Sequence, residues 1–153
     1  MKFIYDFILT ATGVALFSYI DNARWSVTTA SVICGVATFT LSEQLTQSLG
    51  GGFIMYFLSA TLTCFLSEIG ARLLCVPATV ILLPAIIPLV PGSLLYSAMK
   101  GLIIGDALWY SNYGKEALNA TAGIGVAIVS VSAGVRLVYE IKTRLLLNRK
   151  VKK

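Results

Sequence analysis

Residues 76–92 read VPATVILLPAIIPLVPG, and this apolar stretch holds all four prolines of the 153-residue chain. Each proline removes a backbone donor and clashes with the preceding turn of a helix. This density predicts a broken helix, with Pro84 and Pro88 in the break and Pro91 and Gly92 at its end. If the segment spans a membrane, the freed backbone groups must face protein or water, because lipid cannot pair them.

The composition places this segment in a membrane. Hydrophobic residues make up 57% of the chain, charged residues 12%, and the mean hydropathy is +0.83. Soluble domains have about 45–50% apolar and about 25% charged residues. These values exclude intrinsic disorder and most soluble enzymes, and they predict an all-α membrane protein.

Apolar runs divide the chain into helices of the length that crosses a bilayer, about 20 residues each. We expect one transmembrane domain over residues 1–153, a bundle of about five helices whose fourth segment is broken by proline. The expected spans are 3–20, 25–41, 53–67, 76–105 with a break near 84–92, and 117–141, with polar connections at 21–24, 42–52 and 109–116 and a basic tail at 142–153.

The positive charges predict the orientation. Five of the twelve Lys and Arg residues fall in the last ten positions, which is typical of a cytoplasmic flank rather than a nucleic-acid site. With five spans, Arg24 and Arg72 join that tail on the inner side. We therefore expect a multi-pass protein with its N-terminus outside and its C-terminus in the cytoplasm. Binding of anionic membrane lipid by the tail is an open alternative.

The helix that resumes after the break predicts an anion site. Pro91 suits a first turn, and the amides of Gly92, Ser93 and the next residue should be unpaired donors at a positive helix end. A lysine inside a span is costly and often functional, although snorkelling to the interface would also explain it. The expected substrate-binding residues, partly on one helix face, are Pro91, Gly92, Ser93, Tyr96 and Lys100.

Three further charges are candidates for gating or ion coupling. Glu68 and Arg72 are spaced i,i+4 with the acid first, the better order for a helical ion pair. Asp106 follows the broken segment. Anchoring of helix ends at the interface explains the same pattern, so both readings stay open.

Catalytic and metal chemistry have little support. The chain has no histidine, and its three cysteines form no CxxC pair. No Gly-x-Ser-x-Gly motif or pair of intramembrane acids occurs. We therefore expect no enzyme activity, no metal and no cofactor.

Three motifs together resemble the small subunit of the threonine/serine exporter family. They are SEIGAR at 67–72, PAT at 77–79 and PAIIPLVPGSLLY at 84–96, and the resemblance covers nearly the whole chain. The family motif maps onto Glu68, Arg72, Pro84, Pro88, Pro91, Gly92 and Tyr96, whereas Lys100 is outside it.

The resemblance implies a bacterial inner-membrane protein that works with a larger partner subunit. It further implies export of threonine and serine or, for some two-subunit members, of succinate. If the two halves are homologous, the site lies between them and this chain is half of a secondary transporter working by alternating access. The competing interpretation is a structural or regulatory subunit without substrate ligands, and formation of homo-oligomers stays open.

Overall fold

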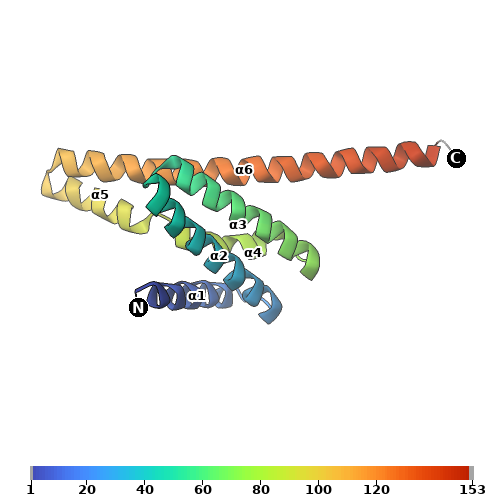
Figure 1. Cartoon of the computed structure of the whole chain (residues 1–153), viewed down its shortest axis with the longest axis horizontal. Helices are drawn as coiled ribbons and strands as arrows, with labels where there is room; N and C mark the ends of the chain where they lie inside the picture. Colours follow the sequence, from blue (N-terminus) through green and yellow to red (C-terminus); the bar gives the residue numbers. More distant parts are fainter. Residues whose placement is uncertain (1, 152–153) are drawn as a thin grey trace.

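A computed structural model describes residues 2–151, and every element in this range is helical, with no strand. The elements are α1 (Lys2–Ile20), α2 (Trp25–Leu49), α3 (Phe53–Leu74), α4 (Ala78–Ile86), the 3-10 helix η1 (Ile87–Leu89), α5 (Gly92–Ile104) and α6 (Ala107–Val151). Helices α1 to α4 lie close together, whereas α5 lies along the first part of α6 (Figure 1). The predicted all-α fold is confirmed.

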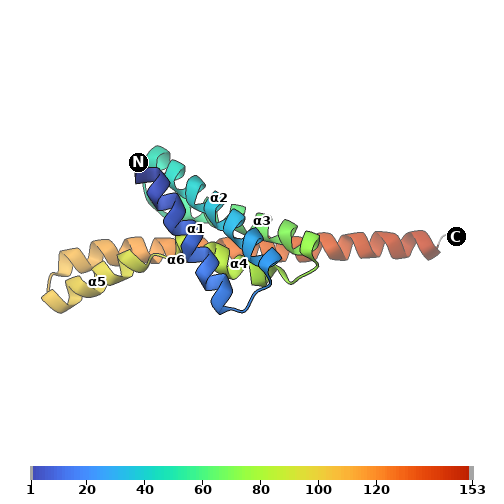
Figure 2. The ribbon, with the colours of Figure 1, turned by 90° about the horizontal axis from the view of Figure 1, so that it is seen from below.

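Helices α2, α3 and α4 pack against one another, with α1 on α2 and α6 on α3. Helix α5 packs chiefly on α6, and the C-terminal part of α6 projects past the other helices (Figures 1 and 2). Helices α3 and α6 run in the same direction, because Gly123 lies against Phe53 near the start of α3 whereas Tyr139 lies under Arg72 near its end. Between them, the bent pair α4 and α5 runs in the opposite direction and brings the chain back once.

Small side chains predominate in the interior, and the outside is apolar. Ala60, Ala85 and Ala127 are fully buried, while Trp25 and Ile103 are 81% and 80% exposed. Buried hydroxyls also line the helix contacts, at Ser18, Ser31, Thr38, Ser59, Thr63 and Ser67. Small residues inside and large apolar residues outside are the pattern of helices that pack in lipid.

Three helices are long and apolar enough to cross a membrane: α2 over Trp25–Ser48, α3, and α6 over Ala107–Ile141. The pair Ala78–Leu89 and Gly92–Ile104 qualifies together as a fourth, bent by 51°. In α1 the apolar part, Ile4–Ile20, is shorter, and five crossings therefore stay a prediction.

Two expected connections are helical instead. Residues 42–49 continue α2, so the turn is confined to Gly50–Gly52, where Gly50 and Gly52 adopt positive φ angles of 72° and 144°. Residues 109–116 belong to the first turns of α6, and the tail is helical to Val151. Lys152 and Lys153 lie outside the described residues. The predictions were wrong because hydropathy marks where apolar residues end, and polar helix formers carry a helix further.

The expected break is shorter than the proline motif. Helix α4 continues through Pro84, which is buried, and Pro88 lies in the 3-10 turn η1. The chain leaves helical geometry at Val90 and Pro91. Pro84 is tolerated because Ile81 and Ala85 on the same helix are fully buried in a cluster with Val27 and Cys34 of α2, which holds α4 in place.

Candidate functional site

The break ends in a tight backbone turn that positions the start of α5. The Gly92 amide donates to the Val90 carbonyl over 2.8 Å, and the Leu95 amide donates to the Pro91 carbonyl over 3.0 Å. Of the three amides expected to be unpaired, that of Gly92 is therefore already bonded. Those of Ser93 and Leu94 remain first-turn donors without acceptors inside the helix.

The side chains expected to bind substrate lie mainly on an open face of α5. Pro91 is buried, whereas Gly92, Ser93, Tyr96 and Lys100 are exposed, Tyr96 by 72%. In this chain alone the face is therefore not enclosed, and any pocket built on it needs a further wall.

Lys100 lies at the contact between α5 and α6. Its Nζ atom is 6.0 Å from the centroid of the Trp109 ring, close enough for a cation–π contact. The Trp109 indole N–H donates to the Ser97 carbonyl over 3.1 Å. Lys100 thus rests on an aromatic residue that also joins the two helices.

Asp106 caps α6. Its Oδ1 atom accepts a hydrogen bond from the Trp109 amide over 3.0 Å, which pairs a first-turn donor and places negative charge at the positive helix end. It forms no ion pair with Lys100 among the described residues.

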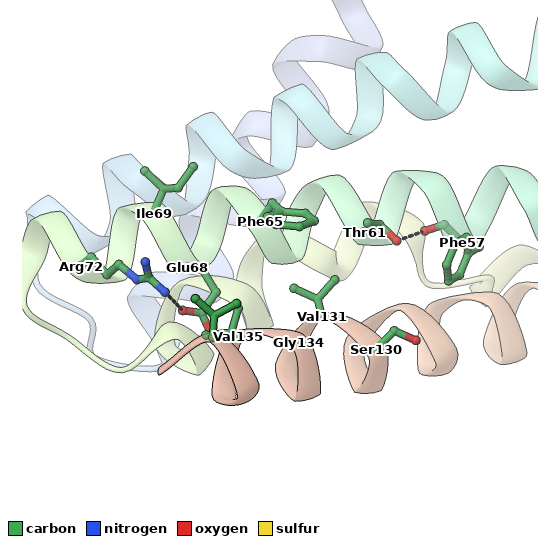
Figure 3. A pocket seen from close by; sticks show the side chains of 11 residues that line it. Phe57, Thr61, Phe65, Glu68, Ile69, Arg72, Ser130, Val131, Gly134 and Val135 are labelled. Atoms are coloured by element: carbon green, nitrogen blue, oxygen red, sulfur yellow. Dashed lines mark hydrogen bonds and ion pairs between the residues drawn. The ribbon is translucent and has the colours of Figure 1, made fainter. Parts of the chain in front are cut away.

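Glu68 and Arg72 lie at the other end of the fold, where α3 faces α6. Arg72 Nη2 is 3.8 Å from Glu68 Oε2, and the Arg72 guanidinium lies 5.2 Å from the centroid of the Tyr139 ring. Both residues border a groove of about 530 Å³ with mostly apolar walls, among them Phe57, Phe65 and Val135 (Figure 3).

The candidate residues therefore fall into two groups. Helix α5 and the C-terminal end of α3 lie at opposite ends of the compact part of the molecule (Figure 1). The structure brings Lys100 and Asp106 together near the α5–α6 turn, and Glu68 with Arg72 on α3, but it does not join the two groups in one site.

A second cavity beside Glu68 contains a charge that the sequence analysis missed. Arg136 of α6 lines a cavity of about 200 Å³ together with residues of α3 and α4. The sequence does contain a signal for this residue. Arg136 is a charge inside the apolar run 117–141, and charges inside spans are rare and commonly functional. It was overlooked because it belongs to no motif.

The fold and these sites define an all-α membrane protein with one interrupted apolar segment and polar residues between its helices. The family model described as threonine/serine exporter, ThrE, matches residues 6–133. The chain belongs to this family, and this confirms the resemblance of its motifs. Its matched region is that of a membrane exporter rather than an enzyme. No curated protein and no solved structure matches the chain significantly.

Proposed function

We propose that this chain is the small membrane subunit of a two-component secondary exporter. Its substrates are small metabolites that carry a carboxylate: threonine and serine, or a dicarboxylate such as succinate. A larger subunit of the same family completes the transporter in a bacterial inner membrane. Family membership supports export, and the architecture supports the division into two parts.

The interrupted segment carries the proposal. Two apolar helices, Ala78–Leu89 and Gly92–Ile104, meet at an angle of 51° with a break of two residues. Broken helices of this kind form the binding sites of many secondary transporters, because the half-helix ends offer unpaired backbone groups to a ligand. A helix whose only task is packing does not need such a break.

The proposed mechanism is alternating access driven by an ion gradient, with protons as the coupling ion. The amides after Gly92 and the ammonium of Lys100 attract the substrate carboxylate. Glu68, with Arg72 beside it, and Asp106 are the acidic groups available to carry a proton. In this scheme the two groups of residues act at different points of the transport route.

The open face of α5 supports a larger partner. Ser93 and Tyr96 are exposed on a helix that packs chiefly on α6. A second subunit with an inverted repeat would supply the missing wall and place the break near an interface between the halves.

A non-transporting structural subunit is the second candidate. Three observations favour it: the bonded Gly92 amide, the capping role of Asp106 and the contact of Lys100 with Trp109. Each gives a structural role to a residue expected to bind substrate or to take part in ion coupling. Water access separates the two candidates. A cysteine placed by Ser93→Cys, in a Cys75→Ser background, should react with a membrane-impermeant maleimide if the chain transports, and should stay protected if it is a scaffold facing lipid.

The direct test is flux into liposomes. Labelled threonine, serine and succinate are offered to liposomes that contain this chain alone or this chain with the large subunit. We expect flux only with both, and the substrate that moves identifies the cargo. Flux with this chain alone would contradict the two-component proposal, and absence of flux with both would favour the scaffold.

A further inference from the structure

We propose that the cavity between α3, α4 and α6 is a loading site for an amino acid with a hydroxyl side chain, which binds there as a zwitterion before it reaches the break. The inference rests on the proposed export function, from which it takes the amino-acid substrate, and adds to it a location and a set of ligands. The polar residues that line the cavity are Cys64, Ser67, Glu68, Thr79, Ser132 and Arg136.

The cavity is formed where three helices meet. Its walls come from the last turns of α3, from residues 77–82 at the start of α4, and from residues 131–136 of α6. Its volume of about 200 Å³ is several times the roughly 30 Å³ that one water molecule occupies in the liquid. A small metabolite therefore fits in this half-open cavity, whose edge is formed by the exposed residues Ser132 and Arg136.

Ser67 lines this cavity and has an unused hydrogen-bonding group. Its side chain is fully buried, and its Oγ atom has no partner among the described residues. Ser31 and Thr63, which are also buried, bond to the carbonyl one turn back, of Val27 and Ser59 respectively. A buried hydroxyl without a partner is unfavourable, and a ligand hydroxyl in the cavity would pair it.

Arg136 supplies an unused positive charge. It forms no ion pair with any described residue, its side chain is exposed at the edge of the cavity, and it lies within Ala107–Ile141, the apolar part of α6. A guanidinium binds a carboxylate through two parallel hydrogen bonds, and a charge in such a position has an anion as its expected partner. It also lies beyond residue 133, where the family match ends.

Glu68 decides between a zwitterion and a dicarboxylate. It borders the same cavity, and its contact with Arg72 uses Oε2 at 3.8 Å, which leaves its other oxygen for a ligand ammonium. An amino acid thus finds a cation for its carboxylate and an anion for its ammonium. A dicarboxylate would place its second negative charge near Glu68, where repulsion opposes binding.

The position of the cavity suits loading for export. In the proposed orientation, the C-terminal end of α3 and the start of α4 face the cytoplasm, as do the later turns of α6. Leu82 lines the cavity and also packs against the cluster that contains Ile86 and Leu89, directly before the break. One turn of α4 therefore connects the loading site to the interrupted segment.

The test measures equilibrium binding of labelled L-threonine to the full chain in detergent micelles, with serine, 2-aminobutyrate, threonine methyl ester and succinate as competitors. We expect saturable binding without the partner, because the proposed ligands Ser67, Glu68 and Arg136 all belong to this chain. Arg136→Gln and Glu68→Gln should each weaken threonine binding about tenfold or more, since each removes a charge-assisted bond. Threonine methyl ester and succinate should compete poorly.

Two matched controls separate the site from general effects on folding. Ser67→Ala should weaken threonine binding about threefold to tenfold and leave 2-aminobutyrate, which has no hydroxyl, unchanged. Ser59→Ala removes a buried unpaired hydroxyl from the same helix. It should change the binding of neither threonine nor 2-aminobutyrate. Arg144→Gln removes an exposed charge of α6 outside the cavity and should bind as the unsubstituted chain does.

Three results would overturn the loading site: no saturable binding, unchanged binding in Arg136→Gln, or competition by succinate equal to that by serine. These outcomes are distinct from failure of the proposed function. Flux by the two-subunit liposomes together with any of them would reject the site and keep the exporter. Binding with the expected pattern, but no flux, would keep the site and reject the exporter.

Discussion

At the residue scale, the clearest contact between α2 and α3 is a pair of threonine hydroxyls. Thr38 Oγ1 and Thr63 Oγ1 are 2.7 Å apart and buried, and each also lies 2.8 Å from the carbonyl one turn back, of Cys34 and Ser59 respectively. Two hydroxyl protons are shared among three contacts. At any moment one of the three contacts therefore lacks a proton. The net contribution of the pair to the free energy of unfolding is modest.

We predict that Thr38→Val lowers the free energy of unfolding by only about 0.6 kcal/mol, the mean for such bonds in a membrane protein. The shape is kept, and the Thr63 hydroxyl can still donate to the Ser59 carbonyl. Unfolding in mixed micelles with increasing sodium dodecyl sulfate measures the change. Thr63→Val and the double variant complete a double-mutant cycle. A loss of unfolding free energy above about 2 kcal/mol for one substitution would contradict the modest value expected from two protons shared among three contacts.

Gly123 allows a close approach of α6 to α3. A Cβ atom at this position would lie 2.8 Å from the Phe53 carbonyl oxygen and 3.1 Å from the Phe57 amide nitrogen. Because both are backbone atoms of a packed helix, neither can move aside without shifting the helix.

We predict that Gly123→Ala destabilises the fold by about 1–3 kcal/mol through overpacking. Gly125→Ala is the matched control, because a Cβ there meets nothing within 4 Å, and its better helix propensity should add stability. The midpoint of thermal unfolding in detergent compares the two variants. Equal midpoints would show that α6 does not approach α3 this closely.

At the scale of elements, the prolines of the interrupted segment have different effects. Pro84 lies inside a continuous helix, while Pro91 stands at the point where α5 begins, with φ −79° and ψ 53°. A proline inside a helix costs about 3 kcal/mol relative to alanine. Replacement of Pro91 therefore removes the main barrier to helix formation across the break.

We predict that Pro91→Ala strongly reduces flux by the two-subunit liposomes, because extension of α5 through Val90 closes the backbone groups off from the substrate. Pro84→Ala should reduce flux much less, since α4 is already helical there. Initial rates of labelled substrate entry, at equal protein incorporation, measure both. The role of the break in transport would be rejected if Pro91→Ala kept the full rate.

Local patterns predicted the elements better than their ends or their contacts. The proline motif located the break to within a few residues, since proline acts on the backbone where it stands. The ends of α2 and α6 were missed because neither Ser42 nor Trp109 breaks a helix. Arg136 and Ser67 could not be placed in one cavity from sequence, because they approach only when α6 packs beside α3, which is a tertiary contact with no local signature.

At the scale of the whole molecule, the direction of the helices determines which ends share a side of the membrane. The hairpins α1–α2 and α2–α3 reverse the chain twice, and the parallel pair α3 and α6 requires one return through α4 and α5. If α1 crosses the membrane, the number of crossings is five and the two termini lie on opposite sides.

We predict that alkaline phosphatase is active when fused to the N-terminus and inactive at the C-terminus, and that a fluorescent protein shows the reverse. The excess of positive charge on the C-terminal side predicts this orientation. A fusion after Gly51 should be phosphatase-positive and serves as an internal control. Phosphatase activity at both ends would mean an even number of crossings and would place the loading cavity on the wrong side for export.

The length of α6 has a mechanical consequence. Its 45 residues form a rod of about 67 Å at 1.5 Å per residue; α5 rests on its first part, α3 braces its middle, and its far part stands free of the bundle. Helix α3 supports this rod from Gly123 to Tyr139, over about 24 Å. A tilt imposed at α5 therefore moves the whole rod as one body and shifts its free end, where any partner bound to the tail would receive the movement.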